Sequence, residues 1–179
     1  MDKRDVVLAF DISSKKTGWS VFRNGRLRVN SKTVGTIEPG DKMSLSEKLE
    51  FFRAEVIKLL DRIQPTKVVV EDVYVRFVGS AIVLARFSGV MLETVRTIAG
   101  FDAVLVTATK ARSFLGAGKN KESAFKFVKE KFRLDSFDFS SHNDITDSIV
   151  VGLAIVKGCV SEKPRKKSKG SRGKKKSTK

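Results

Sequence analysis

Two carboxylates stand at the ends of apolar segments, where folding alone would not place a charge. Asp11 follows the apolar run at residues 6–10, and Glu71 follows the three valines at 68–70. Runs this apolar are typical of strands that are covered on both faces, as in the parallel part of an α/β sheet. A carboxylate at the end of such a strand is costly to desolvate unless a cation or a set of hydrogen bonds compensates it.

A second pair of acids, Asp144 and Asp147, is spaced i, i+3, which places both side chains on one face of a helix. Hard oxygen donors of this kind are the ligands that Mg²⁺ prefers. Strand-end acids and a helical pair of acids in one small, otherwise basic chain therefore predict a two-metal nuclease centre.

Each acid except Asp147 also has a purely structural explanation. Asp11 could cap the turn at residues 13–16, and Glu71 could pair with one of the many lysines. Asp144 fits a helix-start box in which Ser141 is the N-cap and an acidic residue follows three positions later. The combination of all four acids is what favours the metal centre.

The charge of the chain indicates a polyanionic partner. Its 179 residues carry a formal net charge of +16, of which +9 arises in residues 161–179, where ten Lys or Arg face one Glu. That segment has too little apolar content to fold, so we expect a disordered basic arm after a single folded domain at residues 1–160. Lys166 and Lys167 represent its predicted phosphate contacts. A localisation signal and a role in solubility are the alternative interpretations of the arm.

Cysteine usage and hydropathy point to the cell interior. Cys159 is the single cysteine and cannot form an internal disulfide. The sequence has neither a signal-peptide pattern nor an apolar run of about 18 residues. We expect a soluble intracellular protein without membrane contact, in the cytoplasm or at the nucleoid, or in the host cell interior if the source is viral.

The order of the elements predicts an α/β fold. The hairpin signal Asn24-Gly25 joins strands two and three of an antiparallel meander, and a strand-helix-strand succession then makes the later strands parallel. We expect a mixed five-stranded sheet flanked by helices. The predicted strands cover residues 5–12, 18–22, 26–37, 67–71 and 103–106, and the predicted helices cover 45–63, 80–99, 110–115, 123–132 and 142–157.

This arrangement, with acids on the first and fourth strands and on the last helix, resembles the RNase H-like fold. Four segments also resemble the motifs of the RuvC-like Holliday junction resolvases, and the similarity as a whole spans about residues 5–157. They are 10–19 (Phe-Asp-Ile-Ser-Ser-Lys-Lys-Thr-Gly-Trp), 70–74 (Val-Glu-Asp-Val-Tyr), the helix with Ser80, Ala81, Arg86, Gly89 and Val90, and 143–148 (Asn-Asp-Ile-Thr-Asp-Ser).

The resemblance implies a homodimeric Mg²⁺-dependent endonuclease that makes paired, symmetric nicks in a four-way DNA junction. It would use two Mg²⁺ ions, for which Mn²⁺ should substitute, and no small-molecule cofactor besides the metal. Asp11 would bridge the two ions, Glu71 and Asp144 would complete separate ions, and Asp147 would be a further ligand.

Basic and aromatic residues complete the implied site. Lys119 or Lys121, in a glycine-rich turn, would neutralise charge at the scissile phosphate, and the sequence leaves the choice between them open. Lys110 matches another lysine of the family. Tyr74 would stack on a base near the junction centre, and Phe77 is a second candidate for that contact.

Three other functions are compatible with parts of the sequence. A broader branched-DNA or flap endonuclease would share the same acids. A basic DNA-binding protein without catalysis would gain nothing from four clustered acids. An actin-like ATPase shares the strand-turn at residues 11–17, but such proteins need two domains of this kind.

Overall fold

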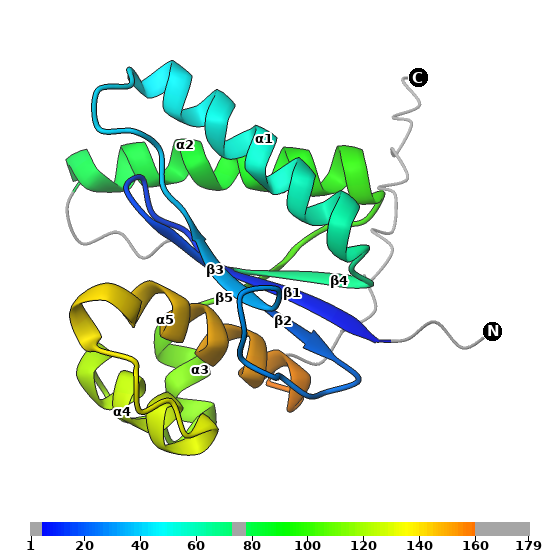
Figure 1. Ribbon diagram of the computed structural model, residues 1–179. Helices are drawn as coiled ribbons and strands as arrows, with labels where there is room; N and C mark the ends of the chain where they lie inside the picture. Colours follow the sequence, from blue (N-terminus) through cyan, green and yellow to red (C-terminus); the bar gives the residue numbers. More distant parts are fainter. Residues whose placement is uncertain (1–4, 73–77, 160–179) are drawn as a thin grey trace, which may run out of the picture.

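The computed structural model describes residues 5–72 and 78–159, which form a five-stranded sheet between two layers of helices (Figure 1). The order across the sheet is β3-β2-β1-β4-β5. Neighbouring strands are antiparallel from β3 to β1 and parallel from β1 to β5. The predicted mixed sheet and RNase H-like fold class are therefore confirmed. The strands are β1 (Val6–Asp11), β2 (Thr17–Arg23), β3 (Val34–Ile37), β4 (Lys67–Glu71) and β5 (Val104–Val106).

Figure 1 shows helices on both faces of the sheet, with α1 and α2 on one face and α3, α4 and α5 on the other. The first layer holds α1 (Leu45–Ile63) and α2 (Val78–Thr94), which continues into a π-helical turn, η1 (Val95–Ala99). The second layer holds α3 (Ala108–Leu115), α4 (Lys121–Phe132) and α5 (Phe139–Val156). In the part of the chain that the structure describes, no helix combines the length and apolar character needed to span a membrane.

The central strand β1 is buried along its whole length and supplies side chains to two separate cores. Leu8 and Phe10 pack beneath α1 and α2, whereas Val7 and Ala9 pack beneath α5. Burial of each large apolar side chain contributes about 1.5–3 kcal/mol. The strand is thus held from both faces, which fixes the position of its last residue, Asp11.

Helix α1 begins and ends as its sequence predicts. Ser44 and Glu47 form a reciprocal capping box at its start. Gln64 caps the end in the left-handed conformation, and Pro65 follows. This helix carries the chain from the edge strand β3 back to β4, next to β1.

Helices α2, α3 and α4 begin two residues before their predicted starts, and two other predicted boundaries are further off. The third strand covers only Val34–Ile37 instead of residues 26–37, because Asn30 and Thr33 close a hydrogen-bonded turn in between. The last helix begins at Phe139 with Asp138 as its N-cap, so the expected N-cap, Ser141, lies inside the first turn. The predicted helix at 80–99 is also not uniform, since its last turn is π-helical.

Candidate active site

Asp11 and Glu71 lie side by side because side chains alternate along a strand. Ala9 on β1 and Val69 on β4 both face α5, so the acids two residues further along also face α5. The strands are parallel neighbours, and the residues directly before the two acids are paired. The sheet therefore places both carboxylates at the same edge and on the same face.

Helix α5 brings the other two acids to this edge. Asp147 is 5% exposed, as is expected for a residue that faces the sheet, while Asp144 is half-buried. Gly18 on β2 permits the approach: a Cβ added there would lie 2.0 Å from the backbone oxygen of Asp144. Because Gly18 pairs with Asp11 in the antiparallel ladder, this backbone contact positions Asp144 close to the end of β1.

The acids oppose one another's ionisation. Burial raises the pKa of Asp11 well above its ordinary value, and the charges of Glu71 and Asp147 raise it further. The pKa of Glu71 is raised first by burial and then by Asp147, and its carboxyl group hydrogen-bonds to that of Asp11. Burial raises the pKa of Asp144 as well. Such a group of buried acids is typical of a functional site that attracts a cation.

Lys121 is the cation that the structure places among these acids. Its Nζ lies 2.8 Å from Oδ2 of Asp147. The contact is an ion pair by distance only, because among the described residues this oxygen has no hydrogen-bond donor of good geometry. Burial alone would lower the pKa of Lys121, but the charges of Asp11 and Asp147 raise it above its ordinary value. The side chain therefore stays protonated at neutral pH.

The turn before α4 explains how Lys121 reaches the acids. Gly116 ends α3 in the left-handed conformation, and Gly118 also has a positive φ, which a larger residue would strain. Asn120 then caps α4 through a reciprocal box with Ser123. Lys121 is thus the first residue of a helix whose start is fixed, and of Lys119 and Lys121 it is Lys121 that lies against an acid of the cluster.

Arg112 is a site residue that sequence reasoning missed. It contributes a charge that lowers the pKa of Glu71, and its Nε donates to the backbone oxygen of Ala108 at 3.3 Å. It lies on the face of α3 that is turned toward the core, whereas Lys110 is exposed. The sequence did contain a signal for this position: residues 108, 111, 112 and 115 have helical spacing and share one face, so Arg112 lies on the same face as the apolar residues.

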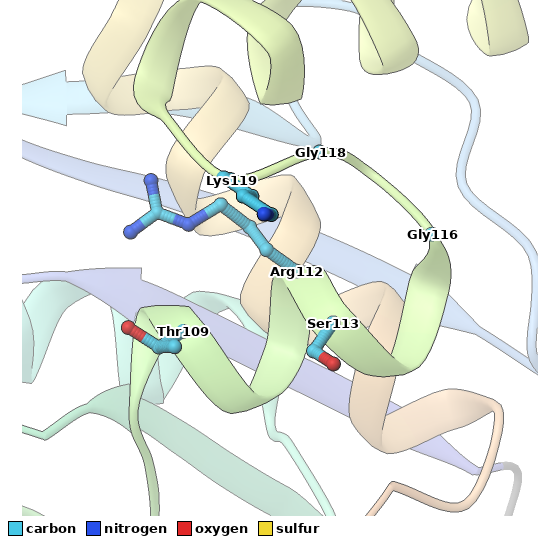
Figure 2. Close-up of a pocket in the computed structure, with 6 residues that line it drawn as sticks. All are labelled: Thr109, Arg112, Ser113, Gly116, Gly118 and Lys119. Carbon is cyan, nitrogen blue, oxygen red and sulfur yellow. The ribbon is translucent and has the colours of Figure 1, made fainter.

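Arg112 and Lys119 line a cavity of about 620 Å³ beside α3. Figure 2 shows Arg112 on the helix and Lys119 in the turn that follows it, with Thr109, Ser113, Gly116 and Gly118 completing the wall. Lys119 is exposed and lies on this cavity, so its surroundings differ from those of Lys121.

The structural explanations for Asp11 and Asp144 do not hold, whereas the charge of Lys121 does act on Glu71. The turn after β1 is closed by Ser13 and Thr17, whose hydroxyl oxygens accept hydrogen bonds from backbone N–H groups. Asp11 is therefore not its cap. Asp144 is not a capping residue either, because Asp138 caps the helix one and a half turns earlier. Lys16 ties this turn to α5, with its Nζ donating to the backbone oxygen of Ser141 at 3.0 Å.

The four carboxylates are chemically suited to bind a divalent cation, but in this structure they are not arranged around one common position. Four carboxylates supply the hard oxygen ligands that Mg²⁺ prefers, and Oδ2 of Asp147 is buried without a well-aligned donor. Among the described residues, however, no three Asp, Glu, His or Cys side chains are grouped closely enough to hold one ion. An ion would have to displace the ammonium of Lys121 and separate the Asp11 and Glu71 carboxyl groups.

Four of the predicted DNA-contacting residues fall outside the part of the chain that the structure describes. Tyr74 and Phe77, together with Lys166 and Lys167, lie outside the described residues. The same holds for the basic arm at 161–179.

The sequence of this chain is similar to the sequences of one known protein family. The profile of the family described as Crossover junction endodeoxyribonuclease RuvC matches residues 7–156. A RuvC protein of Magnetococcus marinus is 32% identical over 150 residues, which cover 82% of this chain and 81% of that protein. A RuvC protein of Dictyoglomus thermophilum is 22% identical over 159 residues, covering 86% of this chain and 99% of its own length.

The fold agrees with a solved structure. RuvC of Thermus thermophilus, solved in complex with a Holliday junction substrate, superimposes with a TM-score of 0.70 at 19% identity. The match covers 87% of this chain and 97% of that one.

Proposed function

Because the chain belongs to the family of RuvC crossover junction endodeoxyribonucleases, we propose that it is a Holliday junction resolvase that makes paired, symmetric nicks in four-way DNA junctions. The observation that carries the proposal is the gathering of Asp11, Glu71, Asp144 and Asp147 at one edge of the sheet. A protein that only bound DNA would lose affinity by concentrating negative charge there.

The four acids would hold the metal, which we propose to be two Mg²⁺ ions, with Mn²⁺ as a substitute. When bound, divalent ions supply Lewis-acid stabilisation of the phosphate and an activated water. Asp11 is the central ligand of this proposal because it is adjacent to Glu71 and interacts with the charge of Asp147. Burial of these carboxylates in one cluster favours cation binding, because a bound cation would reduce the repulsion between their charges.

The cations of the chain would act on the phosphate. With a divalent ion held by the acids, Lys121 would be released from Asp147 and would interact with the charge that develops on the phosphate oxygens. Arg112, whose charge also acts on Glu71, is proposed for the same role, in place of Lys110. Lys119 would contact a neighbouring phosphate from the adjoining cavity.

The remaining assignments extend the proposal beyond the acid cluster. Residues 1–160 would form the nuclease domain, and the arm with Lys166 and Lys167 would attract DNA. Tyr74 and Phe77 would stack on opened bases. The protein would act as a homodimer, for which the 49% exposure of Ile82 on α2 is supporting evidence.

The test compares cleavage of a four-way junction with that of a flap, a linear duplex and a single strand, each with and without Mg²⁺. Paired symmetric nicks on the junction alone are expected. Asp11→Asn should abolish cutting while junction binding persists. Equal cutting of the flap would reassign the protein as a general branched-DNA nuclease, and the absence of metal-dependent cutting would refute the proposal.

A further inference from the structure

A cluster of five cations lies at the end of the sheet opposite to the acids. Four of them surround the turn between β2 and β3, and one follows α5. We call these residues the distal basic surface: Arg23, Arg26, Arg28, Lys32 and Lys157, all of them exposed. Figure 1 shows the β2–β3 connection beside the end of α5, far along the sheet from the α5 start.

The position of the surface follows from the register of β1 and β2. Arg23 pairs with Val6 at the start of β1, whereas Gly18 pairs with Asp11 at its end. Five residue steps at about 3.3–3.4 Å separate these two ends of β1, which amounts to roughly 17 Å. The distal basic surface is therefore distinct from the acid cluster and its lysine.

The arginines are held on a rigid support. Asn24 and Gly25 both have positive φ, as in a tight hairpin turn, and Arg23 and Arg26 exchange two backbone hydrogen bonds across it. Beyond the turn, Leu27 and Val29 pack against the core beneath α5. Alternation along this extended segment directs the side chains of Arg26 and Arg28 away from that core.

The connection is also anchored at its far end and at α5. The side chains of Asn30 and Thr33 close the next turn, and the hydroxyl of Thr33 donates to the backbone oxygen of Arg28. A Cβ added at Gly25 would lie 3.6 Å from a methyl group of Val156, which places Lys157 beside the hairpin. The chain thus presents these charges with little backbone freedom left to lose on binding.

The cations of this surface form no ion pairs with other described residues. Among the ion pairs of the described residues, none involves these five cations. Asp5, the acid nearest in the chain to this end of the sheet, contacts the hydroxyl of Thr66 instead. Five unpaired cations, three of them arginines with a geometry suited to phosphate, favour a polyanion as the partner.

The composition of the surface argues against a protein or a membrane as the partner. The large apolar side chains that are most exposed in the described part of the chain all lie elsewhere: Met43, Ile82, Ile98, Leu105 and Phe114. Protein interfaces and membrane-binding surfaces both need such groups.

We propose that the distal basic surface binds the phosphate backbone of duplex DNA away from the cut, holding an arm of the substrate. The inference deepens the proposed function and rests on it. At about 3.4 Å per base pair, the roughly 17 Å between the two ends of β1 corresponds to contacts at least about five base pairs from the scissile phosphate. The attraction at this distance offsets the repulsion that the acid cluster exerts on DNA.

The test replaces Arg23, Arg26 and Arg28 with Gln in the full chain and measures the dissociation constant for a four-way junction between 50 and 200 mM salt. Each phosphate contact adds about 0.9 to the slope of log affinity against log salt. We expect the slope to fall by about 2 to 3 and the affinity at low salt to fall about tenfold or more.

A matched control removes the same charge from the opposite helix layer. Lys42→Gln, Lys48→Gln and Lys58→Gln together also subtract three charges, but near α1. The inference is overturned if the control and the hairpin variant have the same salt slope. A second variant with Lys at positions 23, 26 and 28 should keep the slope, which excludes misfolding as the cause.

Hydroxyl-radical footprinting locates the contact. The wild type should protect backbone positions about five or more base pairs from the cut, and the Gln variant should lose this protection while it keeps protection at the cut. Protection that is unaltered in the variant would contradict the inference. If the wild type failed to cut junctions but the slope difference persisted, the proposed nuclease function would fail and the surface would stand as a DNA-binding site.

Discussion

At the scale of single residues, the acid cluster opposes folding when no cation is bound. Asp11 is buried, and burial together with two neighbouring acids raises its pKa. An acid whose pKa is raised by folding destabilises the native state once it ionises. Part of the stability of the chain therefore depends on a cation at this site.

Asp11→Asn should raise the melting temperature of the metal-free protein. The penalty from the ionised carboxylate is present above the raised pKa of the folded state and vanishes as pH falls below the ordinary value of 3.8. The gain should be a few degrees at neutral pH, since each kcal/mol corresponds to about 2–4 °C for a chain of this size. Thermal unfolding in a chelator at neutral and acid pH measures it.

The effect of Mg²⁺ on the melting temperature is a second test of the site at Asp11. Added Mg²⁺ should stabilise the wild type by binding to the folded state and should stabilise Asp11→Asn much less. Glu50→Gln, an exposed change on α1, is the control and should alter neither melting temperature. A wild type that is indifferent to Mg²⁺ would contradict a metal site at Asp11.

Arg112→Gln should slow cutting at saturating enzyme by about 10²-fold or more, the range for removing one group that stabilises charge in a transition state. Arg112→Lys should recover part of the rate because it restores the charge. Single-turnover cleavage measures the effect, and the melting temperature verifies the fold. The neighbouring change Lys110→Gln removes an exposed cation and should have a small effect; a larger loss there would restore Lys110 to the role predicted from the sequence.

At the scale of elements, the site depends on how closely α5 approaches β2. Two glycines make the approach possible. A side chain at Gly18 would collide with the backbone of Asp144, and one at Gly152 would collide with the ring of Phe22 at 2.4 Å. These contacts lie near the two ends of the helix, so they fix both its distance from the sheet and the position of its acids.

Gly18→Ala should destabilise the protein and abolish cutting. The added methyl group meets backbone atoms of Asp144, which cannot rotate away, so α5 must shift. Overpacking of this kind costs about 1–3 kcal/mol and occasionally more. Chemical denaturation and junction cleavage measure the two effects.

Gly89→Ala is the matched control for this change. A Cβ at Gly89 in α2 meets nothing within 4 Å, and alanine in a helix is favoured over glycine by about 1 kcal/mol. The control should be neutral or stabilising. If Gly18→Ala behaved in the same way, the close approach of α5 would not be what positions Asp144.

At the scale of the whole molecule, charge is divided between the folded part and the arm. Residues 161–179 carry +9 of the total +16. The folded part must hold DNA close to four acids, so the cations at Arg112 and Lys121, the distal basic surface and the arm all act in the same direction. We expect DNA affinity to be distributed over these groups.

Deletion of residues 161–179 should weaken DNA binding and flatten its salt dependence, because fewer counterions are released. Cutting at saturating enzyme should persist, since the arm contributes no acid to the cluster. Titration of junction binding against salt measures the slope. A scrambled arm of the same composition should behave like the wild type, and an unchanged slope after deletion would mean that the arm acts on something other than DNA.

Local chemistry in the sequence determined much of this protein. The strands that end in Asp11 and Glu71, the bounds of α1 and the mixed sheet of three antiparallel strands followed by parallel ones were predicted from apolar runs, turn and helix-end residues and crossover rules. The basic arm at residues 161–179 stays a prediction from composition. These features are local, so short stretches of sequence suffice to indicate them.

Only the tertiary structure decided the features that depend on contacts between distant segments. The two misplaced boundaries have a local cause instead: at the start of α5 and before β3, side chains bond to backbone groups three residues away, in competition with the regular pattern. The position of Lys121 among the acids and the approach at Gly18 require α4, α5 and β2 to be packed together. Residues far apart in the chain meet only after the two cores have formed, and the sequence carries no spacing that measures such a distance.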